Sequence, residues 1–182
     1  MGSRRLMAAA VVAIALGACG GDEGGNGVEP RRYARDVCGA ASGWVSTLAG
    51  RAGQLGGGEP SRETFTAFLD DAIASTDRLI GQVRQAGVPE VDGGQEFSDS
   101  LVASLGEVRT AFGDARERVA DLPERITDPD DQQVFVEELT RILDDVQNAG
   151  RLIVQDLQQE TPTELDQAIE DEPTCDITVP VA

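Results

Sequence analysis

The sequence FSDSLVASLGEVRTAFGDARERVADL, residues 97–122, repeats its apolar side chains at intervals of three and four. This spacing follows the 3.6-residue period of an α-helix and places the apolar positions on one face. Those positions are Phe97, Leu101, Leu105, Val108, Phe112, Ala115, Val119 and Leu122. The stretch therefore predicts an amphipathic helix that begins near Gln95 and ends before Pro123, which cannot continue a helix.

Three other stretches have the same period. The first runs from Tyr33 to Leu55, the second from Phe65 to Val83, and the fourth along the chain from Phe135 to Leu157. Their predicted inner positions are Tyr33, Val37, Ala41, Trp44, Leu48, Ala52 and Leu55; Phe65, Phe68, Leu69, Ala72, Ile73, Thr76, Leu79, Ile80 and Val83; and Phe135, Leu139, Ile142, Val146, Ile153 and Leu157. Neither a period of two nor a stretch rich in β-branched and aromatic residues is found from Arg31 to Glu160, so no strand is expected.

Start and stop signals separate these stretches. Ser61 after Pro60 is typical of a helix start, and Gly87 before Pro89 is typical of a helix end. Residues 127–131, with the sequence TDPDD, place acidic side chains and a proline where the positive end of the fourth helix dipole would begin. The boundaries therefore agree with the apolar pattern.

Four stripes of similar length with short connections predict an all-α protein, folded as an up-down-up-down four-helix bundle. A short fifth helix is expected from Thr163 to Asp171, where Leu165, Ala168 and Ile169 share one side. The tail from Pro173 to Ala182 is expected to be irregular.

The N-terminal segment has the organisation of an export signal. Arg4 and Arg5 precede an uncharged apolar run from Met7 to Leu16. That run is half of the about 20 residues that a membrane-spanning helix needs, but it suits a signal peptide. The following residues Leu16-Gly17-Ala18-Cys19 resemble the lipobox of bacterial lipoprotein signal peptides. The resemblance implies that residues 1–18 are removed and that the Cys19 thiol carries diacylglycerol.

The predicted domains follow from this leader. Residues 19–30 are interpreted as the lipidated cysteine with a flexible, acidic, Gly-rich tether, and residues 31–182 as the helical bundle. The expected location is the extracytoplasmic face of the cell membrane. One alternative is a short buried helix with an ordinary cysteine; another is N-myristoylation of Gly2, which Leu6 disfavours because that motif needs Ser or Thr there. Ser3-Arg4-Arg5 partly resembles a twin-arginine signal, so the export route stays open.

Two cysteines remain in the predicted mature domain, Cys38 and Cys175. In an oxidising compartment such a pair favours a disulfide. The bundle topology agrees, because the first helix begins at the end where the fourth finishes, and this places both cysteines at one end. A pair of free thiols, or a reactive cysteine, is the alternative.

Composition narrows the functions. The formal charge is −18 at pH 7, which disfavours nucleic acid as a partner because its phosphates are repelled. The chain has no histidine, and all of its basic residues are arginine. The commonest general base and the commonest metal ligand are therefore missing. We therefore expect that the protein is not an enzyme and that it has neither a cofactor nor a metal site.

The candidate motifs favour structural interpretations. Counting an EF-hand loop from Asp128 puts Gln133 and Leu139 where Gly and Glu are required, so capping is preferred to a cation site. Asp144-Asp145 and Glu170-Asp171-Glu172 are interpreted as solvated surface, and Trp44 as a core residue rather than a membrane-interface anchor. Asn148-Ala149-Gly150 is interpreted as a close helix contact, with a ligand-sized void as the alternative.

The mature part is similar to the uncharacterised small α-helical lipoproteins and secreted proteins of high-GC bacteria. The features that match are the lipobox, the spacing from Cys38 to Trp44, the Gly87-Val88-Pro89 turn and the late Cys175. The resemblance implies a location and a fold but no activity. The predicted function is a non-catalytic binding or adaptor module that contacts another envelope protein. The alternative is a carrier of a small apolar ligand or lipid within the bundle core, and an enzyme of unknown type is a third candidate.

Overall fold

The computed structural model describes residues 27–55, 61–124, 131–142, 144 and 161–176, and most of them are helical. The elements are α1 (Pro30–Leu55), α2 (Arg62–Ala86), α3 (Gly94–Ala120), a helical segment at 131–142, α5 (Thr163–Glu170) and the 3₁₀ turn η1 (Pro173–Cys175). No strand forms within this part of the chain. The all-α fold with a short fifth helix is therefore confirmed.

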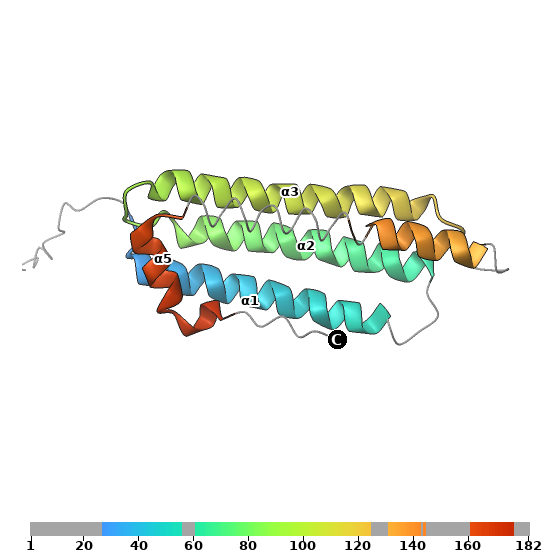
Figure 1. The fold of residues 1–182 in the computed structure, drawn as a ribbon, viewed down its shortest axis with the longest axis horizontal. Helices are drawn as coiled ribbons and strands as arrows, with labels where there is room; N and C mark the ends of the chain where they lie inside the picture. Colours follow the sequence, from blue (N-terminus) through green and yellow to red (C-terminus); the bar gives the residue numbers. More distant parts are fainter. Residues whose placement is uncertain (1–26, 56–60, 125–130, 143, 145–160, 177–182) are drawn as a thin grey trace, which may run out of the picture.

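The long helices lie side by side and alternate in direction (Figure 1). Helix α2 contacts both α1 and α3, and α5 contacts the start of α1. The segment 131–142 lies beside α2 and α3 where α3 finishes (Figure 1). We call the end formed by the start of α1, the α2–α3 connection, α5 and η1 the α5 end. The end formed by the start of α2, the end of α3 and residues 131–142 is the opposite end.

The two ends of α2 have the predicted chemistry. The Ser61 side chain accepts a hydrogen bond from the Thr64 amide at 3.2 Å, and the Thr64 hydroxyl accepts one from the Ser61 amide at 3.2 Å. This reciprocal pair satisfies amides that the first helical turn leaves open. Gly87 ends α2 with φ of 87°, and Gly93 precedes α3 with φ of 79°, a region that favours glycine.

The core is divided along the bundle. At the opposite end, the rings of Phe65 and Phe135 meet edge to face, with centroids 5.7 Å apart. At the α5 end, Tyr33, Phe97 and Leu165 form a separate buried cluster with Ala86. The apolar stripes predicted for α2 and α3 are confirmed, since Phe65, Leu69, Ala72, Leu79, Val83, Phe97, Leu105, Val108, Phe112, Ala115 and Val119 are buried.

Helix α1 is less buried than its pattern predicts. Tyr33 is buried, but Trp44 and Leu48 are half-buried and Ala52 is exposed. Among the described residues, α1 packs along α2, meets α3 near its start through Tyr33, and has α5 and η1 beside its start. Of the predicted fourth stripe, Phe135 and Ile142 are buried. Leu139 is half-buried and packs on the same core, whereas Val146, Ile153 and Leu157, and the predicted start at residues 127–130, lie outside the described residues.

Two boundaries differ from the prediction. The start of the tail is not irregular, because Pro173–Cys175 forms the turn η1. Helix α1 begins at Pro30, which had been assigned to the tether. Proline suits the first helical position, because the amide it lacks would have no partner within the helix. No helix in the described ranges is long and apolar enough to cross a membrane.

Candidate functional site

The predicted lipid attachment residue, Cys19, lies outside the described residues, so its modification stays a prediction. The chain is described from Gly27, and it is already held there. The Val28 amide donates to the Val88 carbonyl at 2.7 Å, and the Glu90 amide donates to the Val28 carbonyl at 2.8 Å. The Val28 side chain packs against the buried cluster of the α5 end. The last residues of the predicted tether therefore belong to the folded domain.

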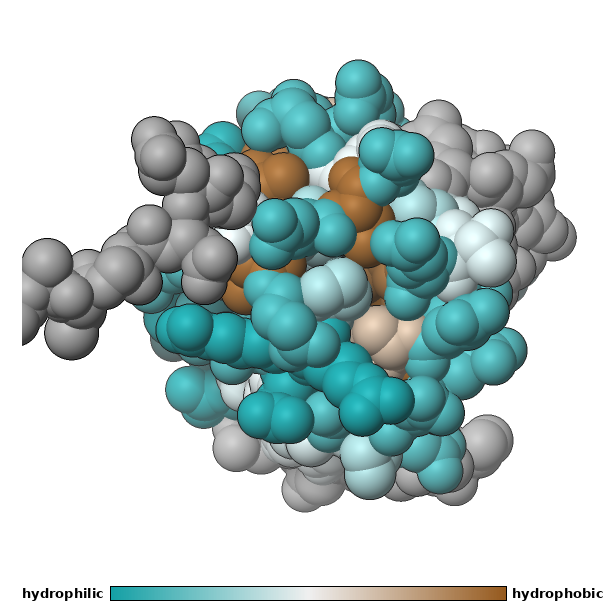
Figure 2. All heavy atoms as spheres, turned by 90° about the vertical axis from the view of Figure 1, so that its left-hand side faces the viewer, coloured by the Kyte–Doolittle hydropathy of each residue, from teal (hydrophilic) through white to brown (hydrophobic). Residues whose placement is uncertain are grey.

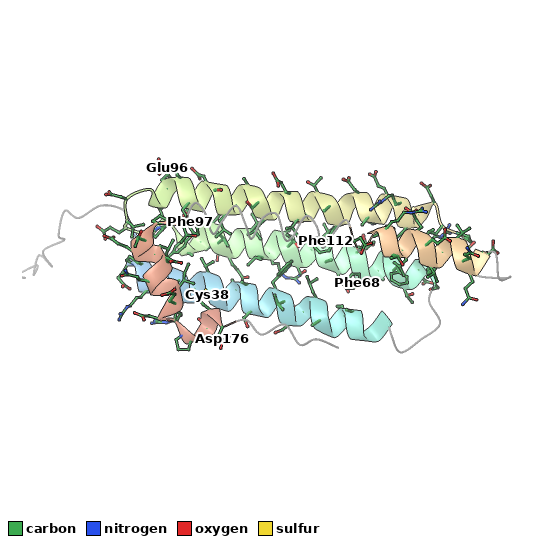
Figure 3. The ribbon with its side chains drawn as sticks, in the orientation of Figure 1. Cys38, Phe68, Glu96, Phe97, Phe112 and Asp176 are labelled. Carbon is green, nitrogen blue, oxygen red and sulfur yellow. A yellow bond between two sulfur atoms is a disulfide. The ribbon has the colours of Figure 1, made fainter. Side chains whose placement is uncertain are left out.

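The disulfide joins α1 to η1. Cys38 and Cys175 are 137 residues apart in sequence, and their Cα atoms are 4.9 Å apart. That separation is within the usual range for a disulfide. The predicted pairing and its position at one end of the bundle are confirmed. The link holds α5 and η1 against the first turns of α1 (Figure 3).

Charged side chains reinforce this junction. Arg31 on α1 pairs with Asp171 at 3.1 Å, and Arg35, one turn later, pairs with Glu172 at 3.3 Å. The Glu172 carboxylate also accepts hydrogen bonds from the amide and the hydroxyl of Thr174, at 3.3 and 3.0 Å. The interpretation of Glu172 as solvated surface is wrong, because its side chain is only 11% exposed and holds the turn.

The environment of Glu172 acts on its acidity. Burial raises the pKa of the carboxyl, but the hydrogen bonds from Thr174 and the positive charge of Arg35 outweigh burial. The net effect lowers the pKa of Glu172 below its ordinary value of 4.5. The carboxylate therefore stays charged at neutral pH, as its role in the turn requires.

Tyr33 is the largest fully buried side chain at the α5 end. Its hydroxyl shares a hydrogen bond of 3.2 Å with the Ser98 hydroxyl, and its ring meets Phe97 edge to face at 6.4 Å. Burial raises the pKa of Tyr33, and the bond to Ser98 partly opposes that effect. A protonated tyrosine in this position links α1 to α3 and is shielded from solvent.

Trp44 lies between core and surface. Its indole nitrogen donates to the Thr76 hydroxyl oxygen at 3.1 Å, and the Thr76 hydroxyl donates to the Ala72 carbonyl at 2.8 Å. The ring packs on the core clusters but remains half-buried, so the core prediction is only partly correct. It borders a groove of about 250 Å³ between α1 and α2, lined by Gly39, Ala40, Gly43, Trp44, Thr47, Ser75, Arg78 and Gln82.

A second depression, at the opposite end, has a volume of about 390 Å³. It opens on the surface and is lined mainly by charged side chains, with Leu122 and Val134 between them.

Elsewhere on the bundle, Asp77 pairs with Arg109 at 2.6 Å, and Asp70 pairs with Arg116. Within the described ranges, no group of three metal-binding side chains is close enough to hold a metal ion.

The face of the α5 end is mostly hydrophilic. Figure 2 shows small apolar areas there, separated by polar and charged side chains. The contacts that build this end leave little trace in the sequence pattern. Val28 is a lone apolar residue before a proline, and the Arg31 and Arg35 pairs join side chains about 140 positions apart.

Comparison with known proteins identifies no relative. No protein-family model, no curated protein and no solved structure matches this chain.

Proposed function

We propose that this protein is an extracytoplasmic lipoprotein, anchored in the cell membrane by lipid on Cys19, whose helical domain is a non-catalytic binding or adaptor module of the envelope. The pairing of Cys38 with Cys175 carries this proposal. Disulfides persist in oxidising compartments, which fits export from the cytoplasm. Of the three cysteines, the pairing leaves Cys19 beside the apolar leader for lipid attachment.

The start of the folded domain determines how such an anchor would hold it. Because Val28 is bonded to the α2–α3 connection, only residues 20–26 would serve as the link. As a Gly-rich coil, this link reaches about 15 Å. The α5 end would then face the membrane, and the opposite end would point away from it. The negative charge of the chain would keep the domain off anionic headgroups.

The surface supports an adaptor more than a carrier. The two depressions described above, the α1–α2 groove and the one beside Val134, are open to solvent and lined largely by polar or charged side chains. A lipid carrier would need an enclosed apolar cavity. An acidic helical surface is suited to an envelope protein with a basic or neutral face.

The anchor is tested with Cys19→Ala in the full chain, expressed in a bacterium that processes lipoproteins. The unchanged protein should sediment with washed membranes, and its mass should show the loss of residues 1–18 and the gain of lipid. Cys19→Ala should lose the lipid and leave the membrane fraction or retain its leader. The control, Cys38→Ala with Cys175→Ala, should keep lipid and membrane attachment. A Cys19→Ala protein that lost its leader and still sedimented with membranes would disprove the anchor.

The adaptor is tested separately, in cells. Crosslinking of the anchored protein should recover a specific envelope partner, and native mass spectra of the detergent-released protein should show no non-covalent lipid. A stoichiometric bound lipid without any crosslinked partner would support the carrier instead.

A further inference from the structure

The groove between α1 and α2 is lined by an arginine without a partner. Arg78 is exposed there, and within the part of the chain that the structure describes its side chain makes neither an ion pair nor a hydrogen bond. The neighbouring Asp77 pairs instead with Arg109 on α3, at 2.6 Å. Asp71, also on α2, pairs with Arg51 on α1 at 3.0 Å. The groove therefore has a guanidinium whose donors are all available, in a strongly acidic chain.

Two hydroxyl groups of the groove are set to accept hydrogen bonds. Ser75, which is only 4% exposed, donates its hydroxyl hydrogen to the Ala72 carbonyl at 2.9 Å. Thr47, on the facing helix, donates to the Gly43 carbonyl at 2.9 Å. A hydroxyl has one hydrogen and two lone pairs, so both oxygens have only acceptor capacity left. A polar ligand in the groove therefore needs acceptor atoms for Arg78 and donor atoms for the two hydroxyls.

An indole ring and two glycines give the groove its shape. The Trp44 ring nitrogen donates to Thr76, so the half-buried ring offers carbon atoms to a ligand. Gly39 and Gly43 line the groove on α1, and a Cβ atom added to either would meet nothing within 4 Å. The volume of about 250 Å³ is below the about 300–1,000 Å³ of sites for drug-sized ligands. The groove therefore suits a ligand of one ring.

We propose that the α1–α2 groove binds a sugar acid, which is a sugar ring that carries one carboxylate. The carboxylate pairs with Arg78, whose planar guanidinium matches two carboxylate oxygens. Hydroxyl groups of the sugar donate to Ser75 and Thr47, and Gln82, which both donates and accepts, bonds to a further hydroxyl. The carbon–hydrogen face of the sugar packs on Trp44. This site needs neither the lipid anchor nor a protein partner, so it goes beyond the proposed function.

Intrinsic fluorescence tests the site, because Trp44 is the only tryptophan of the chain. The full-length protein is titrated at constant ionic strength with sodium D-glucuronate, and in parallel with D-glucose, which has a CH₂OH group in place of the carboxylate. We expect saturable binding of glucuronate at about 1–10 mM. Glucose should bind about tenfold more weakly, because it lacks the charged partner for Arg78. No saturation up to about 100 mM glucuronate, or equal affinity for the two sugars, would overturn the proposal.

Two pairs of variants locate the bound sugar. Arg78→Gln should weaken glucuronate binding about tenfold, whereas Arg84→Gln, at an exposed arginine of α2 outside the groove, should leave it unchanged. Gly43→Leu should fill the groove and abolish binding, whereas Gly50→Leu, at another open glycine of α1, should preserve it. Saturation-transfer NMR of the ligand measures binding independently of the indole, and circular dichroism shows that each variant is folded. Equal binding within either pair of folded variants would overturn the proposal.

A carboxylate without hydroxyl groups distinguishes a sugar acid from an amino acid. N-acetyl-L-leucine has the carboxylate for Arg78 but no hydroxyl for Ser75 and Thr47. It should bind about tenfold more weakly than glucuronate, because two hydrogen bonds are missing. Equal or tighter binding would show that the groove accepts an acyl amino acid and would overturn the assignment of a sugar.

Discussion

Both ends of the bundle contain a buried apolar cluster, but in the described part of the chain only the α5 end is also cross-linked covalently. At the α5 end, segments far apart in sequence are joined by the Cys38–Cys175 disulfide, by the Arg31 and Arg35 ion pairs, and by the Val28 backbone bonds. At the opposite end, an apolar cluster centres on Phe65 and Phe135, and Arg62 donates hydrogen bonds to the carbonyls of Ala120 and Leu122.

This difference shows how a narrow bundle can fix its ends by different means. Apolar packing tolerates small shifts along the helix axes, whereas a covalent bond and directed hydrogen bonds allow only one arrangement. The stability of the α5 end should therefore depend on redox conditions and pH. The stability of the opposite end should depend on the volume of its buried side chains.

The largest effect is expected from removing the disulfide. Cys38→Ser with Cys175→Ser should lower the free energy of unfolding by about 4–5 kcal/mol, because the link closes a loop of well over a hundred residues. Guanidinium denaturation under oxidising conditions measures the change. Adding a reductant to the unchanged protein should reproduce most of it. A loss below about 1 kcal/mol would show that the disulfide contributes little to stability and would contradict the loop-closure argument.

Phe135→Ala should have the next largest effect, at the opposite end. Loss of a fully buried ring that packs on Phe65 should cost about 3–4 kcal/mol, from the lost burial and the cavity left behind. The neighbouring control is Val136→Ala, which should change stability by less than about 0.5 kcal/mol because Val136 is 52% exposed. Thermal and denaturant unfolding measure both. Similar losses in the two variants would show that the 131–142 segment does not pack as described.

Gly94→Ala should have an intermediate effect at the α5 end. A Cβ atom there would collide with the Pro89 backbone carbonyl, which a rigid turn cannot easily move. We expect a loss of about 1–3 kcal/mol. Gly106→Ala, inside the same helix, has nothing within 4 Å of the added atom and should gain up to about 1 kcal/mol. If both variants gained stability, the close approach of Pro89 to Gly94 would be disproved.

The smallest effect is expected from acid. The pKa of Glu172 is lower in the folded protein than its ordinary value of 4.5, so its contribution to stability is present above that value. The contribution is lost as the pH falls below 4.5 and through the folded pKa. Glu172→Gln should reduce stability at neutral pH and weaken the decline of melting temperature with acid. The control is Glu170→Gln, the same change of side chain at an exposed neighbour, and an equal effect in the two variants would contradict the role of Glu172.

The sequence was most informative where one helix face determines packing. The intervals of three and four in α2 and α3 matched the buried positions because both helices pack against described neighbours over most of their length. For α1 the same pattern overstated burial, as Ala52 shows, because periodicity identifies an apolar face but not what covers it. The predicted burial of Trp44 was too high for the same reason.

The contacts at the α5 end were only partly predictable. The cysteine pair followed from their number and from the topology, since few alternatives existed. The partners of Arg31, Arg35 and Glu172 did not follow, because such contacts depend on how α5 lies across α1 rather than on local spacing. The bonds of Val28 were missed because a single apolar residue has no period.

The Val28 bonds also determine where mechanical load would enter the domain. A pull on the chain before Gly27 reaches the two hydrogen bonds to Val88 and Glu90 before it reaches the first turn of α1. The disulfide lies beyond them, at Cys38, and resists the same pull covalently. Weak hydrogen bonds therefore lie before a strong covalent bond along the chain. A moderate force would break the hydrogen bonds first and lengthen the link by a few residues, while the helices stay folded.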